Sequence, residues 1–367
     1  MKVASLHYSN TIINLKKTFG MQVMELGDLR ELGKRGIDAR LFAKDIIGVH
    51  PQISKIEYSL QERYLYDLPY YTRFFDMNRD ADVLQGNCTP LLAIFAPNKT
   101  VLRLDGAIDF PFSEQKNIQK AYHDSHYIFV SEFLKKFYQR KYPFISNDKS
   151  HVIYNAVSDN GFKITGNKRK QILFCSRWVA YKGIYVLLDA LKEVAKKRDD
   201  YDVIIAGGIQ TVNKEDGLGK HKLEEEIEDK LRRIANVKVL GFVPHDALID
   251  LLKTTDFVLF PSLYEEPFGL IPAEAAMAGV PTIAFNCGGI PEVVKHNCTG
   301  ILLEKSRFQF INAKRLAFAI VKLLDNEGMT AKLGENARER CLRKFGWESY
   351  INKLIGVYKT IASEAKK

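Results

Sequence analysis

Residues 256–285 read DFVLFPSLYEEPFGLIPAEAAMAGVPTIAF. The apolar runs at the two ends of this stretch are short, as expected for strands that are buried on both faces of a parallel sheet. Between them, the Pro-Phe-Gly break at 267–269 interrupts the chain, Pro272 suits the first turn of a helix, and the Gly-Val-Pro segment at 279–281 ends that helix. The stretch therefore predicts a strand, a loop, a helix and a second strand, which is the repeating unit of a parallel α/β sheet.

Two carboxylates in this stretch, Glu266 and Glu274, raise the question of an acid/base pair. The break places Glu266 on the loop and Glu274 in the first turns of the helix. The backbone N–H groups of Phe268, Gly269 and Leu270 then lie near the positive end of the helix dipole, which forms an anion site. The alternative interpretation is that Glu266 is a solvated loop acid and that Glu274 only favours the dipole.

Short apolar runs alternate with amphipathic patterns along the rest of the chain, and the pattern restarts after the segment 157–169. This alternation predicts parallel strands joined by right-handed crossovers. The sequence therefore predicts an α/β protein with two doubly wound, Rossmann-like halves. Ligands of such sheets lie outside the carboxyl ends of the strands, so we expect the site in a central cleft that the two halves face.

The individual elements follow from the same patterns. Strands are predicted within 2–8, 38–43, 100–106, 125–131, 150–157, 171–177, 201–208, 236–242, 256–262 and 281–285. Helices are predicted within 23–32, 132–138, 183–197, 222–234, 245–255 and 271–279.

The segment SRWVAYKG, residues 176–183, also follows a predicted strand and carries Arg177 and Lys182. An arginine offers a planar fork and a lysine a point charge, and the two together suit a diphosphate. Gly183 lets the chain turn into the next helix. The alternative is that both cations are ordinary surface charges.

Composition narrows the function classes. The chain has 367 residues, which suits two domains, and its 46% hydrophobic and 27% charged residues exclude disordered and fibrous classes. The net charge of +10 suits an anionic partner such as a nucleoside diphosphate, an acidic membrane or nucleic acid. The charge is spread along the chain, which counts against nucleic acid, and no GxGxxG follows a strand, which counts against a nicotinamide dehydrogenase.

Targeting and metal signals are weak. No apolar run approaches the length of a membrane-spanning helix, and MKVASLHYSN has no apolar core of a signal peptide. Five scattered cysteines suit a reducing compartment, so we expect a cytoplasmic protein. The eight histidines form no HxH or HExxH pattern, and the sequence predicts neither a metal site nor a bound cofactor.

Together, these stretches resemble the retaining glycosyltransferases of family 4, which have the two-domain GT-B fold. The resemblance covers nearly the whole chain and is strongest from about residue 170 to about residue 300. The E-x7-E motif of the family corresponds to Glu266 and Glu274, and its diphosphate-binding pair to Arg177 and Lys182. Shorter matches are NVKVLGFVP, HVIYNAV and GGIPEVV.

The resemblance implies a role for each matched residue. Glu274 would hold the ribose hydroxyls of a sugar nucleotide, and Glu266 would hydrogen-bond the donor sugar. The amides of residues 268–270 would contact sugar and phosphate, while Arg177 and Lys182 would neutralise the leaving diphosphate.

Further contacts and the domain limits also come from the resemblance. The main chain near Phe242 and Val243 would meet the base, and the loop at Gly20 would close over the phosphates. The last helix would return to the N-terminal half. This gives an acceptor-side domain of residues 1–158 plus about 347–367, and a nucleotide-sugar domain of residues 159–346.

The chain departs from the family pattern in two places. Many members have a histidine after the strand that here reads TVLRLDGAID, where this chain has Asp105, with Arg103 two residues earlier. Asp105 is a candidate for binding an acceptor hydroxyl or for acid/base chemistry, with Arg103 beside it. The alternative is that Asp105 pairs with Arg103 or caps a turn before Gly106. The family's Gly-Gly in the first loop is reduced to Gly20.

Residues 131–144, SEFLKKFYQRKYPF, mix aromatic and basic side chains. Such a segment could lie on an acidic membrane, which would give peripheral contact with its inner face. The spacing of Phe133, Leu134, Phe137 and Tyr138 favours instead a core-facing stripe with the cations on the wet side.

These observations predict a retaining, metal-independent glycosyltransferase of the hexosyltransferase type, which would act in glycan biosynthesis. It would move a sugar from a nucleotide sugar to a hydroxyl of a glycan, a lipid-linked or a small-molecule acceptor. The alternatives are a sugar-nucleotide epimerase of similar fold and a non-catalytic sugar-nucleotide-binding protein. The motifs do not specify the base, the sugar or the acceptor.

Overall fold

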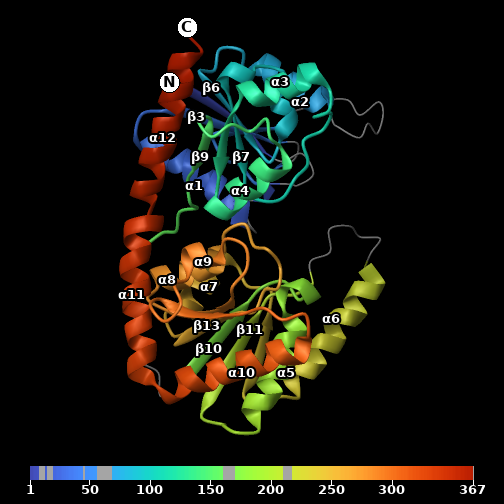
Figure 1. The fold of residues 1–367 in the computed structure, drawn as a ribbon, viewed down its shortest axis with the longest axis vertical. Helices are drawn as coiled ribbons and strands as arrows, with labels where there is room; N and C mark the ends of the chain where they lie inside the picture. Colours follow the sequence, from blue (N-terminus) through green and yellow to red (C-terminus); the bar gives the residue numbers. More distant parts are fainter. Residues whose placement is uncertain are drawn as a thin grey trace. The chain divides into compact units, whose positions relative to one another are not determined.

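The computed structural model describes residues 1–7, 13–14, 20–43, 46–55, 68–159, 170–209 and 217–366. The chain forms two compact units, residues 1–156 with 347–367, and residues 157–346 (Figure 1). The boundary lies two residues before the one expected from the sequence, and most of the predicted connection at 157–169 lies outside the described residues.

The N-terminal unit contains a parallel sheet of seven described strands in the order β5-β3-β1-β6-β7-β8-β9. These strands are β1 (Lys2–Leu6), β3 (Asp38–Ala43), β5 (Ile53–Lys55), β6 (Val83–Asn87), β7 (Thr100–Leu104), β8 (His126–Phe129) and β9 (Ser150–Val152). A short pair, β2 (Ile13–Asn14) and β4 (Ile46–Ile47), lies apart from it. The chain winds outward in one direction from β1 and later in the other, so the strand order reverses between β1 and β6.

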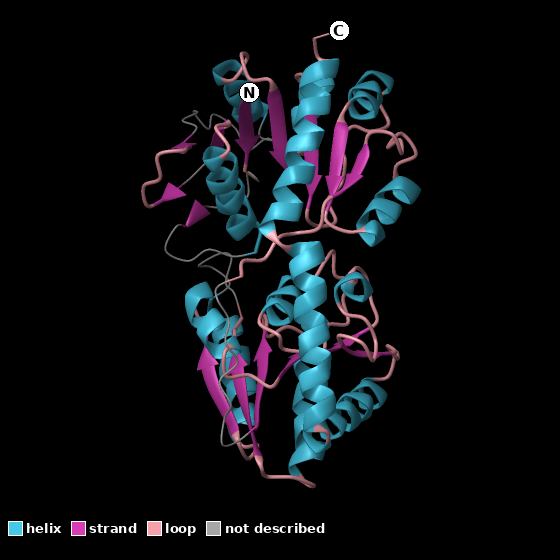
Figure 2. Cartoon of the chain, turned by 90° about the vertical axis from the view of Figure 1, so that its left-hand side faces the viewer, coloured by secondary structure: helices cyan, strands magenta, loops and turns pink. Residues whose placement is uncertain are grey.

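Helices flank this sheet (Figure 2). They are α1 (Gly20–Lys34), α2 (Leu68–Met77), α3 (Lys116–Asp124), α4 (Glu132–Lys141) and α12 (Trp347–Glu364), with two short 3-10 turns, η1 (Pro90–Ile94) and η2 (Pro97–Lys99). As the resemblance implied, α12 belongs to this unit. Its residues Ile351, Leu354, Tyr358 and Ile361 are buried in the same apolar core as Val83 of β6.

The C-terminal unit contains a parallel sheet of six described strands in the order β12-β11-β10-β13-β14-β15. They are β10 (Lys170–Cys175), β11 (Tyr201–Ala206), β12 (Val237–Gly241), β13 (Phe257–Phe260), β14 (Thr282–Phe285) and β15 (Gly300–Leu303). Here the strand order reverses between β10 and β13. The predicted fold class, an α/β protein with two Rossmann-like units, is confirmed.

Helices flank the second sheet as well. They are α5 (Ile184–Ala195), α6 (Gly217–Arg232), α7 (His245–Leu252), α8 (Leu270–Met277), α9 (Ile290–Val293), α10 (Gln309–Asp325) and α11 (Glu327–Phe345), with the 3-10 turn η3 (Ala180–Lys182). The stripe predicted for α5 is buried: Ile184, Leu187, Leu188, Leu191 and Val194. Short strands, of which β13 and β14 are buried along their whole length, and one-sided helices produce the alternation that the sequence displays.

In the part of the chain that the structure describes, no helix is both long enough and apolar enough to span a bilayer.

Packing of α12 against α1 depends on a glycine. A Cβ atom on Gly27 would lie 1.9 Å from the Trp347 ring, whereas a Cβ on Gly33 in the same helix would have only the Gln52 amide, at 3.6 Å, near it. Gly27→Ala should therefore destabilise the N-terminal unit by about 1–3 kcal/mol through overpacking. Gly33→Ala should stabilise it by roughly 0.5–1 kcal/mol, because alanine favours the helix.

Urea unfolding of the two variants measures the difference. Equal effects at both positions would contradict the contact between Gly27 and Trp347.

Candidate functional site

The reversal of strand order in the C-terminal unit brings the loops after β10 and β13 together. Because β10 and β13 are neighbours in the sheet, their carboxyl ends lie side by side. Gly183, which ends the first loop, has a φ of 81° and packs against the second: a Cβ there would lie 1.9 Å from the Pro261 carbonyl oxygen. The backbone N–H of Leu263 also donates to the carbonyl of Tyr181 at 2.8 Å.

An ion pair joins the two loops. Lys182 Nζ lies 2.5 Å from Glu266 Oε1, and both side chains are largely buried. The hydroxyl of the buried Ser262 donates to the same oxygen at 2.5 Å. No described residue hydrogen-bonds Glu266 Oε2, so one carboxylate oxygen remains available to a ligand.

Arg177, the second predicted cation, is exposed and lies over the ring of Tyr181, at 5.5 Å from its centroid. The Tyr181 ring in turn packs at 5.7 Å from that of Tyr264, and Lys182 Nζ lies 5.6 Å from the Tyr264 centroid. Within the described residues Arg177 has no ion-pair partner. Its guanidinium is positioned by the aromatic ring, with its hydrogen-bond donors unspent on protein carboxylates.

A glycine turn supports the loop that carries Glu266. The N–H of Gly289 donates to the carbonyl of Glu266 at 2.6 Å, and the N–H of Gly288 donates to Glu265 Oε2 at 2.6 Å. Lys305 Nζ pairs with the other Glu265 oxygen at 2.7 Å. Partial burial raises the pKa of Glu265, but these two hydrogen bonds outweigh that effect and lower it below its ordinary value. Through these contacts Glu265 stabilises the glycine turn.

The helix α8 begins where the sequence predicts, after Gly269. This glycine has a φ of 107°, and a Cβ there would lie 2.6 Å from Ile290 Cδ1. Phe268 is buried and packs edge-on against Phe345 at 5.4 Å. Leu270 is the first helical residue, and the first N–H groups of a helix have no acceptor within it.

Glu274 has a partner that the sequence analysis missed. Its Oε1 lies 2.7 Å from Nε2 of His245, the first residue of α7, which follows β12. The hydrogen bond to Glu274 raises the pKa of His245 above its ordinary value, against the opposing effect of burial. A histidine at the start of a helix, directly after residues predicted to contact a ligand, is a signal that could have revealed it.

Phe242 and Val243 lie on the same connection between β12 and α7. Phe242 is 43% exposed, so its ring lies at the surface. In the sequence it is close to His245, which pairs with Glu274. The C-terminal unit therefore brings Arg177, Lys182 and Glu266 to one pair of strand ends, and places Glu274 with the loop after β12.

Gly20, Arg103 and Asp105 lie in the N-terminal unit. Gly20 is the first residue of α1, and the loop before it at 15–19 lies outside the described residues. Arg103 is buried and its Nε donates to Asp105 Oδ2 at 3.1 Å. The pairing considered from the sequence therefore forms.

Arg103 also serves other parts of this unit. Its Nη1 donates to Asp28 Oδ2 at 2.9 Å, and its Nη2 donates to Asn155 Oδ1 at 2.8 Å. Tyr350 of α12 lies 2.6 Å from the same Nη1. Burial raises the pKa of Asp28 to about 7, and the charge of the Arg103 guanidinium offsets this effect only in part.

The segment 131–144 turns most of its apolar stripe toward the core. Leu134 and Tyr138 are buried and Phe133 is half-buried, while Phe137 is 37% exposed. The core-facing interpretation therefore holds for three of its four apolar positions. Among the described residues, no group of three His, Cys, Asp or Glu side chains is placed to hold a metal ion.

Comparison with known proteins finds a family match in the C-terminal unit. Residues 159–340 match the family Glycosyl transferases group 1. The protein described as uncharacterized glycosyltransferase MJ1607 of Methanocaldococcus jannaschii is 28% identical over 230 residues, which are 58% of this chain and 54% of that protein. The chain thus spans about half the length of this curated relative.

Two solved structures are similar over nearly the whole chain. A glycosyltransferase from Rickettsia africae has a TM-score of 0.79 at 18% identity, with 98% of each chain covered. Alr3699/HepE of Anabaena, solved in complex with UDP and glucose, has a TM-score of 0.74 at 19% identity, with 98% of this chain and 100% of that chain covered. At these identities the likeness establishes the fold.

The His245–Glu274 pair predicts a pH dependence. Because the folded-state pKa of His245 is raised, its contribution to stability is complete below the unfolded pKa of about 6.5 and is lost as pH rises through the folded value. Glu274→Gln should return the pKa of His245 toward its ordinary value and remove this dependence, which NMR titration of the imidazole measures. An unchanged His245 titration in that variant would contradict the pair.

Proposed function

We propose that this chain, whose residues 159–340 match the family Glycosyl transferases group 1, moves a sugar from a nucleoside-diphosphate sugar to a hydroxyl of an acceptor. The observation that carries the proposal is the pairing of Lys182 with Glu266 at the strand-order reversal between β10 and β13. A cation and a carboxylate with one unspent oxygen, held together at such a point, suit a ligand that carries both phosphate and sugar hydroxyls.

The donor would span three loops of the C-terminal unit. Glu274, held by His245, would accept hydrogen bonds from the ribose hydroxyls, with the base near Phe242 and Val243. The diphosphate would lie at Arg177 and Lys182. Because Glu274 and Glu266 would bind opposite ends of the donor, they need not flank one bond, as the two carboxylates of a glycosidase must.

Glu266 would bind the transferred sugar through its unspent oxygen, while its Oε1 stays with Lys182 and Ser262. This arrangement gives Lys182 two roles. It orients the carboxylate that holds the sugar, and its other N–H groups face the leaving phosphate. The N–H groups of residues 268–270 at the start of α8 would add neutral donors to the same anion.

The reaction breaks the bond between the anomeric carbon and the phosphate oxygen, and the electron pair stays on the diphosphate. A bond forms between the anomeric carbon and the acceptor oxygen, whose proton passes to the departing phosphate. Fixed cations and amides stabilise the growing negative charge. In comparable sites such stabilisation lowers the barrier by several kcal/mol. We propose attack from the same face, which retains the anomeric configuration, and charge compensation by Arg177 and Lys182 in place of a metal.

Asp105 is the candidate group for the acceptor. Its carboxylate is bound by Arg103 Nε and is largely buried, so it would be held in place to orient a hydroxyl. Screening of nucleotide sugars for thermal stabilisation assigns the donor base and sugar. UDP-glucose is a rational first donor, because the Anabaena neighbour is described with UDP and glucose.

An assay of the wild-type protein tests the proposal against its alternatives. A transferase releases the nucleoside diphosphate in proportion to the glycosylated acceptor. An epimerase would convert the donor sugar with no acceptor present, which NMR of the donor alone detects. A binding protein would show saturable thermal stabilisation and no release with any acceptor tested.

Replacement of Glu266 tests the sugar contact. Glu266→Gln should lower turnover roughly 30- to 1,000-fold, about 2–4 kcal/mol of barrier, because the charge that orients both sugar and Lys182 is lost. Glu265→Gln is the matched control: its amide oxygen can still accept from Gly288, so turnover should stay near that of the wild type. Equal turnover of the two variants would remove Glu266 from the site.

Replacement of the two cations tests the diphosphate contact. The double variant Arg177→Ala with Lys182→Ala should bind the free nucleoside diphosphate at least roughly 100-fold more weakly, since two charge-assisted contacts are lost. Isothermal titration calorimetry measures this change. Nucleotide affinity close to that of the wild type would refute the clamp.

A further inference from the structure

The outer side of α10 carries large apolar side chains in water. Phe318 is 74% exposed and Phe310 is 58% exposed. Lys314 lies between them and Lys322 follows, so that the four residues stand four positions apart on one side of the helix. The opposite side of α10, with Leu316, Ile320, Leu323 and Leu324, is buried in the core, which α5 shares. Packing in the core therefore does not explain why phenylalanine occupies positions 310 and 318.

Another exposed aromatic side chain, that of Phe308, directly precedes the helix. Phe308, 45% exposed, lies 5.9 Å from the Phe310 ring, and the guanidinium of Arg307 lies 4.6 Å from the Phe308 centroid. Phenylalanine and basic residues thus occur together from Arg307 to Lys322.

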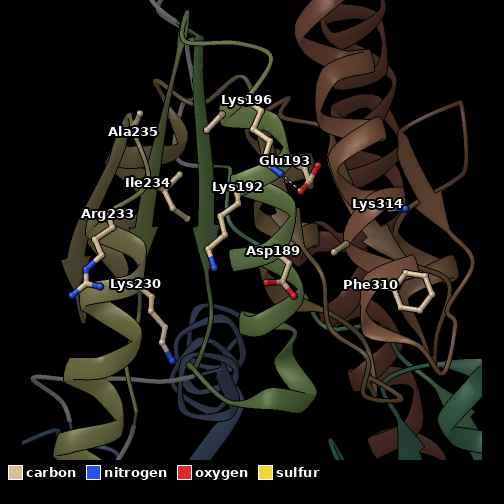
Figure 3. A pocket seen from close by; sticks show the side chains of 12 residues that line it. Asp189, Lys192, Glu193, Lys196, Lys230, Arg233, Ile234, Ala235, Phe310 and Lys314 are labelled. Atoms are coloured by element: carbon tan, nitrogen blue, oxygen red, sulfur yellow. Dashed lines mark hydrogen bonds and ion pairs between the residues drawn. The ribbon is translucent and has the colours of Figure 1, made fainter.

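A basic groove adjoins this side of α10. It has a volume of about 700 Å³ and is bounded by the second halves of α5 and α6 and the first turns of α10 (Figure 3). Its charged lining residues are Lys192, Lys196, Lys230, Arg233, Lys314, Asp189 and Glu193.

Both acids of the groove already have partners. Glu193 pairs with Lys196 at 2.6 Å, and Asp189 accepts from the Gln309 amide at 2.6 Å. In the described part of the chain, Lys192, Lys230, Arg233 and Lys314 have no carboxylate within ion-pair distance. The groove therefore presents an uncompensated positive field.

Charge and exposed aromatic area together select the occupant. A small soluble anion would use the cations and leave the phenylalanines in water. A second copy of the same face would bring like charges together. An acidic bilayer satisfies both features, because its headgroup phosphates attract the cations and its interface accepts the rings.

We propose that this face, formed by the outer side of α10 and the groove between α5, α6 and α10, docks on an anionic lipid surface. Phe310 and Phe318 enter the interface, while Lys314, Lys322 and the groove cations contact headgroup phosphates. The face replaces segment 131–144 as the membrane-contacting candidate, since Leu134 and Tyr138 of that segment are buried. The inference is independent of the donor and acceptor chemistry.

Vesicle cosedimentation of the full chain tests the proposal. The wild type should bind phosphatidylcholine vesicles that contain phosphatidylglycerol, bind pure phosphatidylcholine far more weakly, and release as salt is raised. Phe310→Ser with Phe318→Ser, and separately Lys314→Glu with Lys322→Glu, should each weaken binding at least roughly tenfold. Phe310, Lys314 and Phe318 are exposed and Lys322 is partly exposed, so the thermal unfolding midpoint should stay near that of the wild type.

A matched control lies on α4, where Phe137→Ser with Lys136→Glu makes the same kind of change in segment 131–144 and should leave vesicle binding intact. Absence of wild-type binding, binding kept by both α10 variants, or binding lost in the α4 control would each overturn the proposal. So would concentration-dependent self-association that Phe318→Ser abolishes, because a second copy would then cover the face.

Discussion

The reversal of strand order between β10 and β13 is the constraint on which the candidate site depends. At that point the connections leave the sheet in opposite directions, and two loops meet at their carboxyl ends. The loops are then fixed by close approaches that only glycine permits, at Gly183 against Pro261 and at Gly288 against the Glu266 backbone. The Lys182–Glu266 pair is the polar counterpart of this packing. The Lys182 and Glu266 side chains can pair without backbone strain, because backbone contacts already hold the two loops together.

In the N-terminal unit the strand order reverses between β1 and β6, and the packing there differs from that in the C-terminal unit. Polar residues here lie in the interior: Asn87 donates to Glu25 at 2.8 Å, and Gln85 donates to Asn87 at 2.9 Å. Tyr358 of α12 donates to Gln85 at 2.6 Å. Because every such group must be paired when buried, the network ties α12 to β6 more specifically than apolar contact alone would.

An element could be predicted from the sequence where the signals for it lie within the element itself. It was missed where its residues depend on partners that are distant in the chain. The segment 256–285 contains its own signals, so its strand, loop, helix and strand were predicted correctly. By contrast β6, with the sequence VLQGN, was not predicted, because Gly86 and Asn87 are typical of turns. In the structure Tyr358 donates to the buried Gln85 and Asn87 donates to Glu25, so these polar side chains are paired within a strand.

The candidate site follows the same rule. The sequence could place Lys182 and Glu266 on loops after strands, but their contact required the strand order, which joins residues 84 positions apart. The His245–Glu274 pair was missed because its partners come from the connections after two strands that are not neighbours. Local pattern specifies elements, whereas pairing across loops depends on topology.

The helix α5 separates the two surfaces of the C-terminal unit that carry function in these proposals. It begins directly after Lys182 and Gly183, beside the donor loops, and its last turns carry Lys192, which lines the basic groove. Its twelve residues extend about 18 Å, so a docked lipid surface would lie one helix length from the phosphate-binding loop. Docking through the groove therefore leaves the carboxyl ends of β10 and β13 open to a soluble sugar nucleotide, and the two sites can be occupied together.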